Sequence, residues 1–333
     1  MYNYRSLEFQ GVFKGIEEII RKRNLGILEL DFLNNSALQD IIKVLEQKDC
    51  CSLTELKLGC TQTPTELFNV IRKNKGLKVL ELSEMSINST PLYHYLGNSL
   101  FKLVDSRNLK ELKLDGCGFL SNLLPKNVDL INLTKMVIVP SSSVASIISN
   151  DTDCEISEIV SNMPNLKSLI IPIISDLPLI VLSNHCLELE ELDVIDGKNI
   201  SDQGLLALTK LNHLKKLALG SAIHVTNTSM LEIIRNGRDL SRISLPFSNR
   251  YLDSKILPCI IEHCPRLEAI TNLPAQITFE ELKDFSQSMD YLVILGRCIG
   301  ESRAFSTNGY LNKLQIDSIK NNSKKLCHFI QNG

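Results

Sequence analysis

The chain has no tryptophan among its 333 residues, and aromatic residues make up only 5% of it. No run of 18 or more apolar residues is present, which excludes an apolar membrane-spanning helix. Glu and Arg interrupt the first 24 residues before an apolar signal-peptide core could form. We therefore expect a cytoplasmic chain, with the nucleus as the alternative location, and no membrane partner.

An excess of positive charge is also missing. The 36 Lys and Arg residues are balanced by 38 Asp and Glu residues, and both signs are mixed along the chain. Recognition of nucleic acid depends on a basic patch or stripe. The charge pattern therefore predicts that nucleic acid is not a partner.

Catalytic signatures are absent as well. The 16 glycines include no G-x-G-x-x-G, no phosphate-binding G-x-x-x-x-G-K-[ST] and no G-x-S-x-G, and there is no H-E-x-x-H. We predict that the chain is not an enzyme and holds no cofactor.

Two His-Cys pairs, His185-Cys186 and His263-Cys264, suggest a zinc site at first sight. They recur three repeats apart, about 14 Å on a stacked sheet, which is too far for one ion. Buried, unmodified cysteines in a reducing compartment explain them better. Asp151 and Asp153 match part of a calcium loop without its Gly and terminal Glu, so we expect a solvated loop there and predict no metal.

A repeated hexamer, L-x-x-L-x-L with conservative replacements, runs along the whole chain at intervals of about 26 residues. Ten clear copies and two weaker ones begin at Leu25, Leu53, Leu77, Leu109, Leu133, Leu166, Leu189, Leu214, Leu240, Leu267, Tyr291 and Leu311. Apolar residues at helical spacing lie between them, as in DQGLLALTK and TSMLEIIR.

The spacing predicts how each hexamer is buried. Residues two apart on a strand share a face, so the fourth and sixth positions enter the core and the third and fifth point outward. One strand and its helix cannot cover their own apolar face, so the units must stack. We therefore predict an α/β leucine-rich-repeat solenoid of about twelve repeats, with a parallel sheet on its concave face and helices on its convex face.

Further residues recur in the repeats. Cys50, Cys186 and Cys264 each stand three residues before the first Leu of a hexamer, and Cys117 stands eight after Leu109. The same grid gives equivalent places to Ile200, Val225 and Tyr251, and to Leu205, Met230 and Ile256. The chain thus resembles the cysteine-containing leucine-rich repeats of F-box receptor subunits of ubiquitin ligases, most closely over residues 160–275.

The resemblance implies a receptor that reads a protein substrate. An F-box module needs about forty to fifty residues before the repeats, and only 24 precede Leu25, so we expect no F-box. Because a stack exposes apolar surface at both ends, we predict closing helices over 1–24 and 317–333 around a single continuous solenoid domain over 25–316.

The outward strand positions suggest where a partner binds. The early repeats are charged, and the face becomes apolar in repeats five to seven. The predicted partner-binding residues are Val137, Val139, Ile170, Ile195, Glu111, Lys113, Lys135, Glu191 and Asp193. An aligned apolar patch on an open sheet marks a partner site. The alternative is that 92–98 or 139–153, in the two longest repeats, covers the patch.

These features predict a non-catalytic scaffold or receptor that is monomeric alone and binds a protein on its concave face. A role in substrate recognition for a ubiquitin ligase follows only by analogy with the repeat type. Two alternatives stay open: a regulator of a small GTPase and a structural assembly subunit. The partner's identity is not encoded in the repeat pattern.

Overall fold

The computed structural model describes residues 20, 25–33, 35–47, 52–60, 66–83, 107–117, 130–140, 150–173, 175–247, 249–274, 276–288, 292–296 and 327–331. The chain divides into two compact units, Met1–Pro172 and Ile173–Gly333, which are described separately. The prediction of one continuous domain over 25–316 stays a prediction. No helix in the described ranges is long and apolar enough to cross a membrane.

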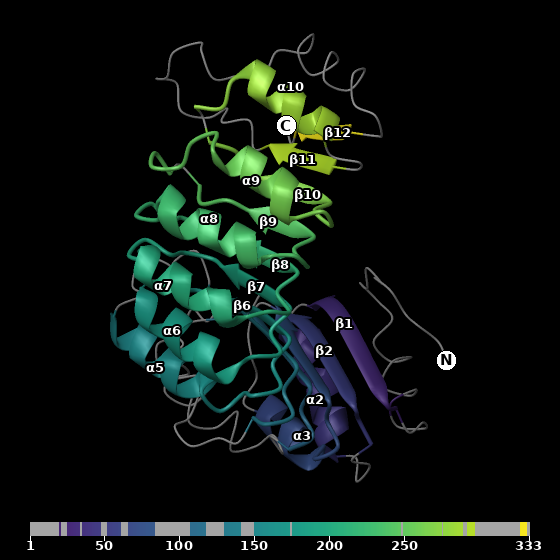
Figure 1. Cartoon of the computed structure of the whole chain (residues 1–333). Helices are drawn as coiled ribbons and strands as arrows, with labels where there is room; N and C mark the ends of the chain where they lie inside the picture. The colour runs from purple at the N-terminus through teal and green to yellow at the C-terminus, as the bar shows by residue number, and fades with distance from the viewer. Residues whose placement is uncertain are drawn as a thin grey trace. The chain divides into compact units, whose positions relative to one another are not determined.

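The first unit is a parallel sheet whose strands follow one another in chain order (Figure 1). Its strands are β1 (Ile27–Leu33), β2 (Glu55–Cys60), β3 (Val79–Ser83), β4 (Glu111–Cys117), β5 (Lys135–Pro140) and β6 (Ser168–Ile171). Its described helices are α2 (Asn35–Gln47), α3 (Glu66–Lys73) and α5 (Asn150–Val160).

The second unit has the same design, and each strand is followed by a helix through most of it. Its strands are β7 (Glu191–Val194), β8 (Lys216–Ala218), β9 (Arg242–Ser244), β10 (Ala269–Thr271), β11 (Leu292–Gly296) and β12 (Cys327–Gln331). Its helices are α6 (Asp176–His185), α7 (Asp202–Ala207) with the 3-10 turn η3 (Leu208–Lys210), α8 (Asn227–Asn236), α9 (Ile256–His263) and α10 (Phe279–Ser288).

Strand register confirms the predicted hexamer grid. In the first unit the fourth positions pair across all six strands, in the order Leu28, Leu56, Leu80, Leu112, Met136 and Leu169. In the second unit the same row is Leu192, Leu217, Ile243, Ile270 and Ile294. All these side chains except Ile294, which is not described, are at most 7% exposed, so the rows form the two cores.

The ends of the chain differ from the prediction. Residues Cys327–Gln331 form β12, which pairs in parallel with β11, so the predicted closing helix over 317–333 is wrong for these residues. The free edge of β11 offers backbone donors and acceptors that a strand satisfies and a helix does not. The weak hexamer at Leu311 lies outside the described residues. Of the predicted helix over 1–24, only Ile20 is described, and it is helical and buried.

Two local predictions were also wrong. The expected loop at Asp151 and Asp153 is the first turn of α5, and Asp153 is 1% exposed, because Ile156 and Val160 of that helix pack into the core. Tyr251 is 55% exposed, although its equivalents Ile200 and Val225 are fully buried.

Leu252, 1% exposed, takes the place predicted for Tyr251. The buried Asn249 amide donates hydrogen bonds to the carbonyls of Ala222 and Val225, at 2.9 and 2.7 Å. It also accepts one from the Tyr251 N–H, at 2.7 Å. The buried residue of this segment is therefore Leu252, one position after the one expected from the repeat grid. The Tyr251 hydroxyl stays exposed to solvent, where it needs no buried hydrogen-bond partner.

Aspartates at the start of the helices join one repeat to the next in the second unit. Asp176 accepts hydrogen bonds from the Ser201 N–H and hydroxyl, at 2.7 and 2.6 Å. Asp202 accepts bonds from the Thr226 N–H and hydroxyl, at 2.8 and 2.6 Å, and from the Ser229 hydroxyl. Ser201 and Thr226 are also the N-caps of α7 and α8, so each aspartate fixes the start of the next helix.

We predict that Asp202→Asn lowers the free energy of unfolding by about 1–2 kcal/mol at pH 7, since the amide cannot accept all three hydrogen bonds. Burial raises the pKa of Asp202, but the bonds from Ser229 and Thr226 outweigh it and leave the pKa lowered. The carboxylate thus contributes stability above its unfolded pKa of about 4, and this contribution is lost as the pH falls through the folded value. Urea unfolding from pH 7 to pH 3 should show the difference between variant and wild type shrinking.

The control is Glu232→Gln, which removes only the exposed pair with Arg235 on α8. Its effect should stay within about 0.5 kcal/mol at every pH. Equal effects of the two substitutions would contradict a linking role for Asp202.

Candidate functional site: the open face of the sheets

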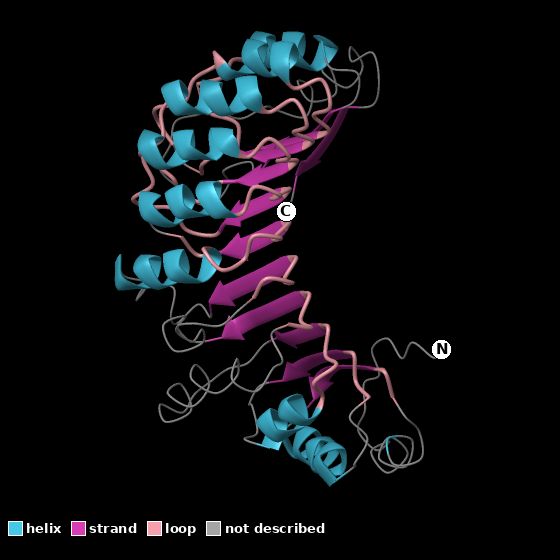
Figure 2. Cartoon of the chain, turned by 60° about the horizontal axis from the view of Figure 1, so that its bottom comes forward, coloured by secondary structure: helices cyan, strands magenta, loops and turns pink. Residues whose placement is uncertain are grey.

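In each unit the described helices cover one face of the sheet, and the opposite face carries the third and fifth positions of the hexamers (Figure 2). We call this opposite side the open face. It is the predicted partner surface, and all the predicted site residues except Ile195 lie on its strands. Ile195 directly follows β7.

Charges on the open face of the first unit are largely paired with one another. Lysines and glutamates on neighbouring strands form the pairs Lys57–Glu29 (3.8 Å), Lys113–Glu81 (2.5 Å) and Lys135–Glu111 (3.9 Å). Exposed ion pairs of this kind contribute about 0–1 kcal/mol each. The predicted contacts Glu111, Lys113 and Lys135 therefore already have partners, and a ligand would have to compete for them.

The predicted apolar centre is only partly accessible. Val137 stands in register between Lys113 and Ile170 on the open face, yet it is only 6% exposed. Val139 and Ile170 are half-buried. Most of the two segments that could cover the patch, 92–98 and 139–153, lies outside the described residues, so both alternatives for the patch stay open.

The open face of the second unit has a different charge pattern. Glu191 is paired with Lys216 of the next strand. Asp193 and the exposed Arg242 form no hydrogen bond or ion pair with another described residue. Burial raises the pKa of Asp193. These two side chains are therefore available to a partner, with opposite charges.

Arg242 was not among the predicted contacts, although the amino-acid sequence shows that its neighbouring strands offer it no acidic partner. In the register it stands between Lys216 and Ala269, so no acidic residue faces it from either neighbouring strand. Ala218 and Ser244, beside Asp193 and Arg242, are small and leave room above the sheet. Cross-strand charge matching, once the strands are aligned, would have identified Arg242.

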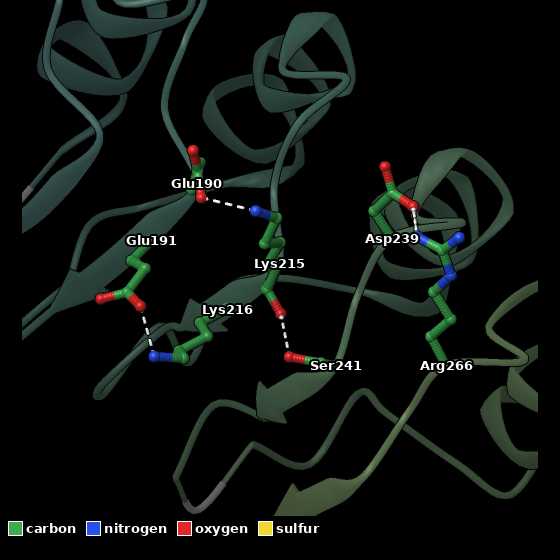
Figure 3. Close-up of polar contacts among 7 residues, drawn as sticks. All are labelled: Glu190, Glu191, Lys215, Lys216, Asp239, Ser241 and Arg266. Atoms are coloured by element: carbon green, nitrogen blue, oxygen red, sulfur yellow. Dashed lines mark hydrogen bonds and ion pairs between the residues drawn. The ribbon is translucent and has the colours of Figure 1, made fainter.

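At the edge where the strands begin, charges are paired from repeat to repeat (Figure 3). The Lys215 ammonium lies 2.6 Å from Glu190, and Arg266 lies 2.6 Å from Asp239. The hydrogen bond to Glu190 raises the pKa of Lys215. The Ser241 hydroxyl donates to the Lys215 carbonyl, at 3.2 Å. This edge therefore consists of internal links between repeats.

The paired His-Cys motifs hold structural cysteines. Cys186 and Cys264 are free thiols, 0% and 1% exposed, and burial raises the pKa of each to about 12. The Cys264 thiol donates to the carbonyls of Ile234 and Gly237. The described part of the chain contains no cluster of three or more His, Cys, Asp or Glu side chains that could hold a metal ion.

Comparison with solved structures supports the fold. No family model matches the chain, and no match was found among curated proteins. A chain of the yeast Rad7 and Elc1 complex is similar, with a TM-score of 0.64 and 18% identity over 92% of this chain and 79% of that one. An internalin, InlF of Listeria monocytogenes, has a TM-score of 0.50 and 15% identity over 97% and 95%. The chain thus has the leucine-rich-repeat fold; the repeat number stays a prediction.

We predict that Val137→Thr destabilises the chain by about 1–2 kcal/mol, because a hydroxyl at a buried site loses its bonds to water. The matched control is Val79→Thr, at a half-buried open-face position of β3, with an expected effect within about 0.5 kcal/mol. Urea unfolding followed by circular dichroism measures both. Equal small effects would show that Val137 is accessible in solution and would restore it as a contact.

Proposed function

We propose that this chain is a non-catalytic scaffold or receptor that binds a protein partner on its open face, which is the concave side of a leucine-rich-repeat solenoid. The proposal rests on two charged residues of the open face, Asp193 and Arg242. These two charged side chains have no partner among the described residues, whereas their charged neighbours are paired. Paired surface charges stabilise the fold, while free ones are available to fix the register of a ligand.

The proposed contacts extend the predicted set. Asp193 and Arg242 supply the charged contacts, with Ile170, Val139 and Ile195 as apolar candidates in their own units. Glu111, Lys113, Lys135 and Glu191 are candidates that would have to leave an internal ion pair, and Val137 would first have to be uncovered.

A place in a ubiquitin-ligase pathway remains part of the proposal. Its support is the cysteine-containing repeat pattern and the similarity to a chain crystallised in the complex of Rad7 with Elc1, a two-protein assembly. The regulator of a small GTPase and the structural assembly subunit are the other outcomes of the test.

The test is affinity purification of the tagged full chain followed by mass spectrometry, for the wild type and for Arg242→Glu. We expect the wild type to recover a partner and the charge reversal to reduce its recovery about tenfold or more, as for a central interface arginine. Recovery of cullin-type ligase components would support the ubiquitin-ligase pathway. Recovery of a GTPase would support a regulator of a small GTPase, and recovery of one stoichiometric complex would support a structural assembly subunit.

Lys43→Glu is the control, since it reverses an exposed charge on helix α2, on the covered side of the first sheet. It should recover the same proteins as the wild type. Unchanged recovery with Arg242→Glu, in a chain that melts like the wild type, would move the binding site away from the open face.

A further inference from the structure

The loops that follow the strands of the second unit are packed tightly against one another. Gly220, after β8, has φ +47°, and a Cβ there would lie 2.3 Å from the Asp196 carbonyl oxygen of the loop after β7. The Ser221 N–H donates to that oxygen at 2.8 Å, and the Phe247 N–H, after β9, donates to the Gly220 carbonyl at 2.8 Å. Three consecutive loops thus form one continuous edge, which we call the strand-end edge.

Apolar side chains gather on this edge. Ten large apolar residues among the described ones are exposed, and four of them lie here: Ile195 (37%), Ile223 (40%), Phe247 (38%) and Tyr251 (55%). They come from three successive repeats, and Phe247 and Tyr251 are the only aromatic members of the ten. The other six come from separate strands, helices and loops. Single exposed apolar residues are normal, whereas a contiguous group marks an interaction site.

Hydrogen bonds join the loop that carries Ile223 to the loop that carries Tyr251. The Asn249 amide donates to the carbonyls of Ala222 and Val225, on either side of Ile223. Asn249 in turn accepts from the N–H of Tyr251. Ile223, Arg250 and Tyr251 therefore project from two loops that are bonded together.

Two of the three loops of this edge carry no acidic residue. Segments 219–227 and 245–252 contain no Asp or Glu, but they contain Arg250 and His224, both exposed. The Arg250 side chain has no ion pair or hydrogen bond with a described residue, and only its backbone carbonyl accepts one, from Gln276. Two acids flank these segments, and both have partners: Asp196, in the loop after β7, pairs with Lys198 at 3.1 Å, and Asp253 pairs with Lys255 at 3.7 Å.

We infer that the strand-end edge is a second binding surface, for a polypeptide segment that carries an acidic side chain next to an aromatic or aliphatic one. The apolar residue packs against Phe247, Tyr251 and Ile223, and the carboxylate pairs with Arg250. Aromatic residues and arginine supply most of the binding energy in protein interfaces. This surface meets the open face at Ile195, which the two surfaces share, but Phe247, Tyr251, Ile223 and Arg250 are not contacts of the open face, so the inference does not rest on the proposed function.

A displayed library of random peptides, selected on the full-length chain, tests the inference. Enriched peptides should combine Asp or Glu with a neighbouring aromatic or aliphatic residue. Fluorescence anisotropy with a fluorescein-labelled enriched peptide should show affinities about tenfold or more weaker for Phe247→Ser and for Arg250→Glu. Arg250→Lys keeps the charge and should retain most of the binding, and added salt should weaken wild-type binding more than Arg250→Glu binding.

Two substitutions at the opposite edge are matched controls. Leu187→Ser changes an apolar residue that is 51% exposed, and Arg238→Glu reverses an exposed arginine without a described partner. Both should bind the peptide within about twofold of the wild type. Melting temperatures of all variants separate lost binding from lost folding. If Phe247→Ser is unstable, Tyr251→Ser replaces it, because that side chain is more exposed.

Several results would overturn the inference: no enriched peptide, enriched peptides without an acidic residue, or peptide binding unaffected by the edge variants. Binding lost in Arg242→Glu but kept in Arg250→Glu would assign the peptide to the open face. A concentration-dependent dimer in analytical ultracentrifugation that Phe247→Ser dissolves would make a second copy of the chain the occupant. If the wild type binds phosphatidylserine vesicles and Arg250→Glu abolishes this binding, the ligand of the strand-end edge would instead be a membrane.

Discussion

The stacking of leucines from strand to strand is the constraint on which the rest of this structure depends. A strand of three to seven residues with one helix has too little apolar surface to fold alone, and it is stabilised only when its buried row continues into the next repeat. The row from Leu28 to Leu169 in the first unit does this without a break in register. Because side chains alternate along a strand, fixing this row also fixes which residues face outward.

That alternation explains why so much of the fold could be predicted from the sequence. Each hexamer carries its own register signal, and the ten clear copies agree, so the strands from β1 to β10 all begin within their predicted segments. The prediction failed where one repeat departs from the pattern for local reasons. Leu252 is buried in place of Tyr251 because the Asn249 amide fixes the conformation of the loop. Strand β12 forms where a helix was expected because it pairs with the edge of β11. Hydrogen bonds of this kind leave no periodic trace in a sequence.

The candidate site was less predictable, for a related reason. Outward positions could be listed correctly, but their availability depends on the neighbouring strand. Glu111, Lys113 and Lys135 were predicted as contacts from their outward strand positions and their charge, and cross-strand pairing gives each of them a partner within the chain. Arg242 has the same orientation and no acidic neighbour, and only the register distinguishes it from them.

The same reasoning separates the two edges of the second sheet. Where the strands begin, Lys215 and Arg266 are each matched by an acid of the preceding repeat, so charge there stabilises the stack. Where the strands end, the backbone makes the links, through Gly220, Ser221 and the Phe247 N–H. Among the side chains, the buried Asn249 amide adds to these links, while the exposed side chains Phe247, Arg250 and Tyr251 make no described hydrogen bond or ion pair between repeats. An edge whose exposed side chains are not needed for stacking can accept Phe247, Arg250 and Tyr251 without cost to the fold, and this is the condition under which a repeat protein can acquire a binding surface beyond its open face.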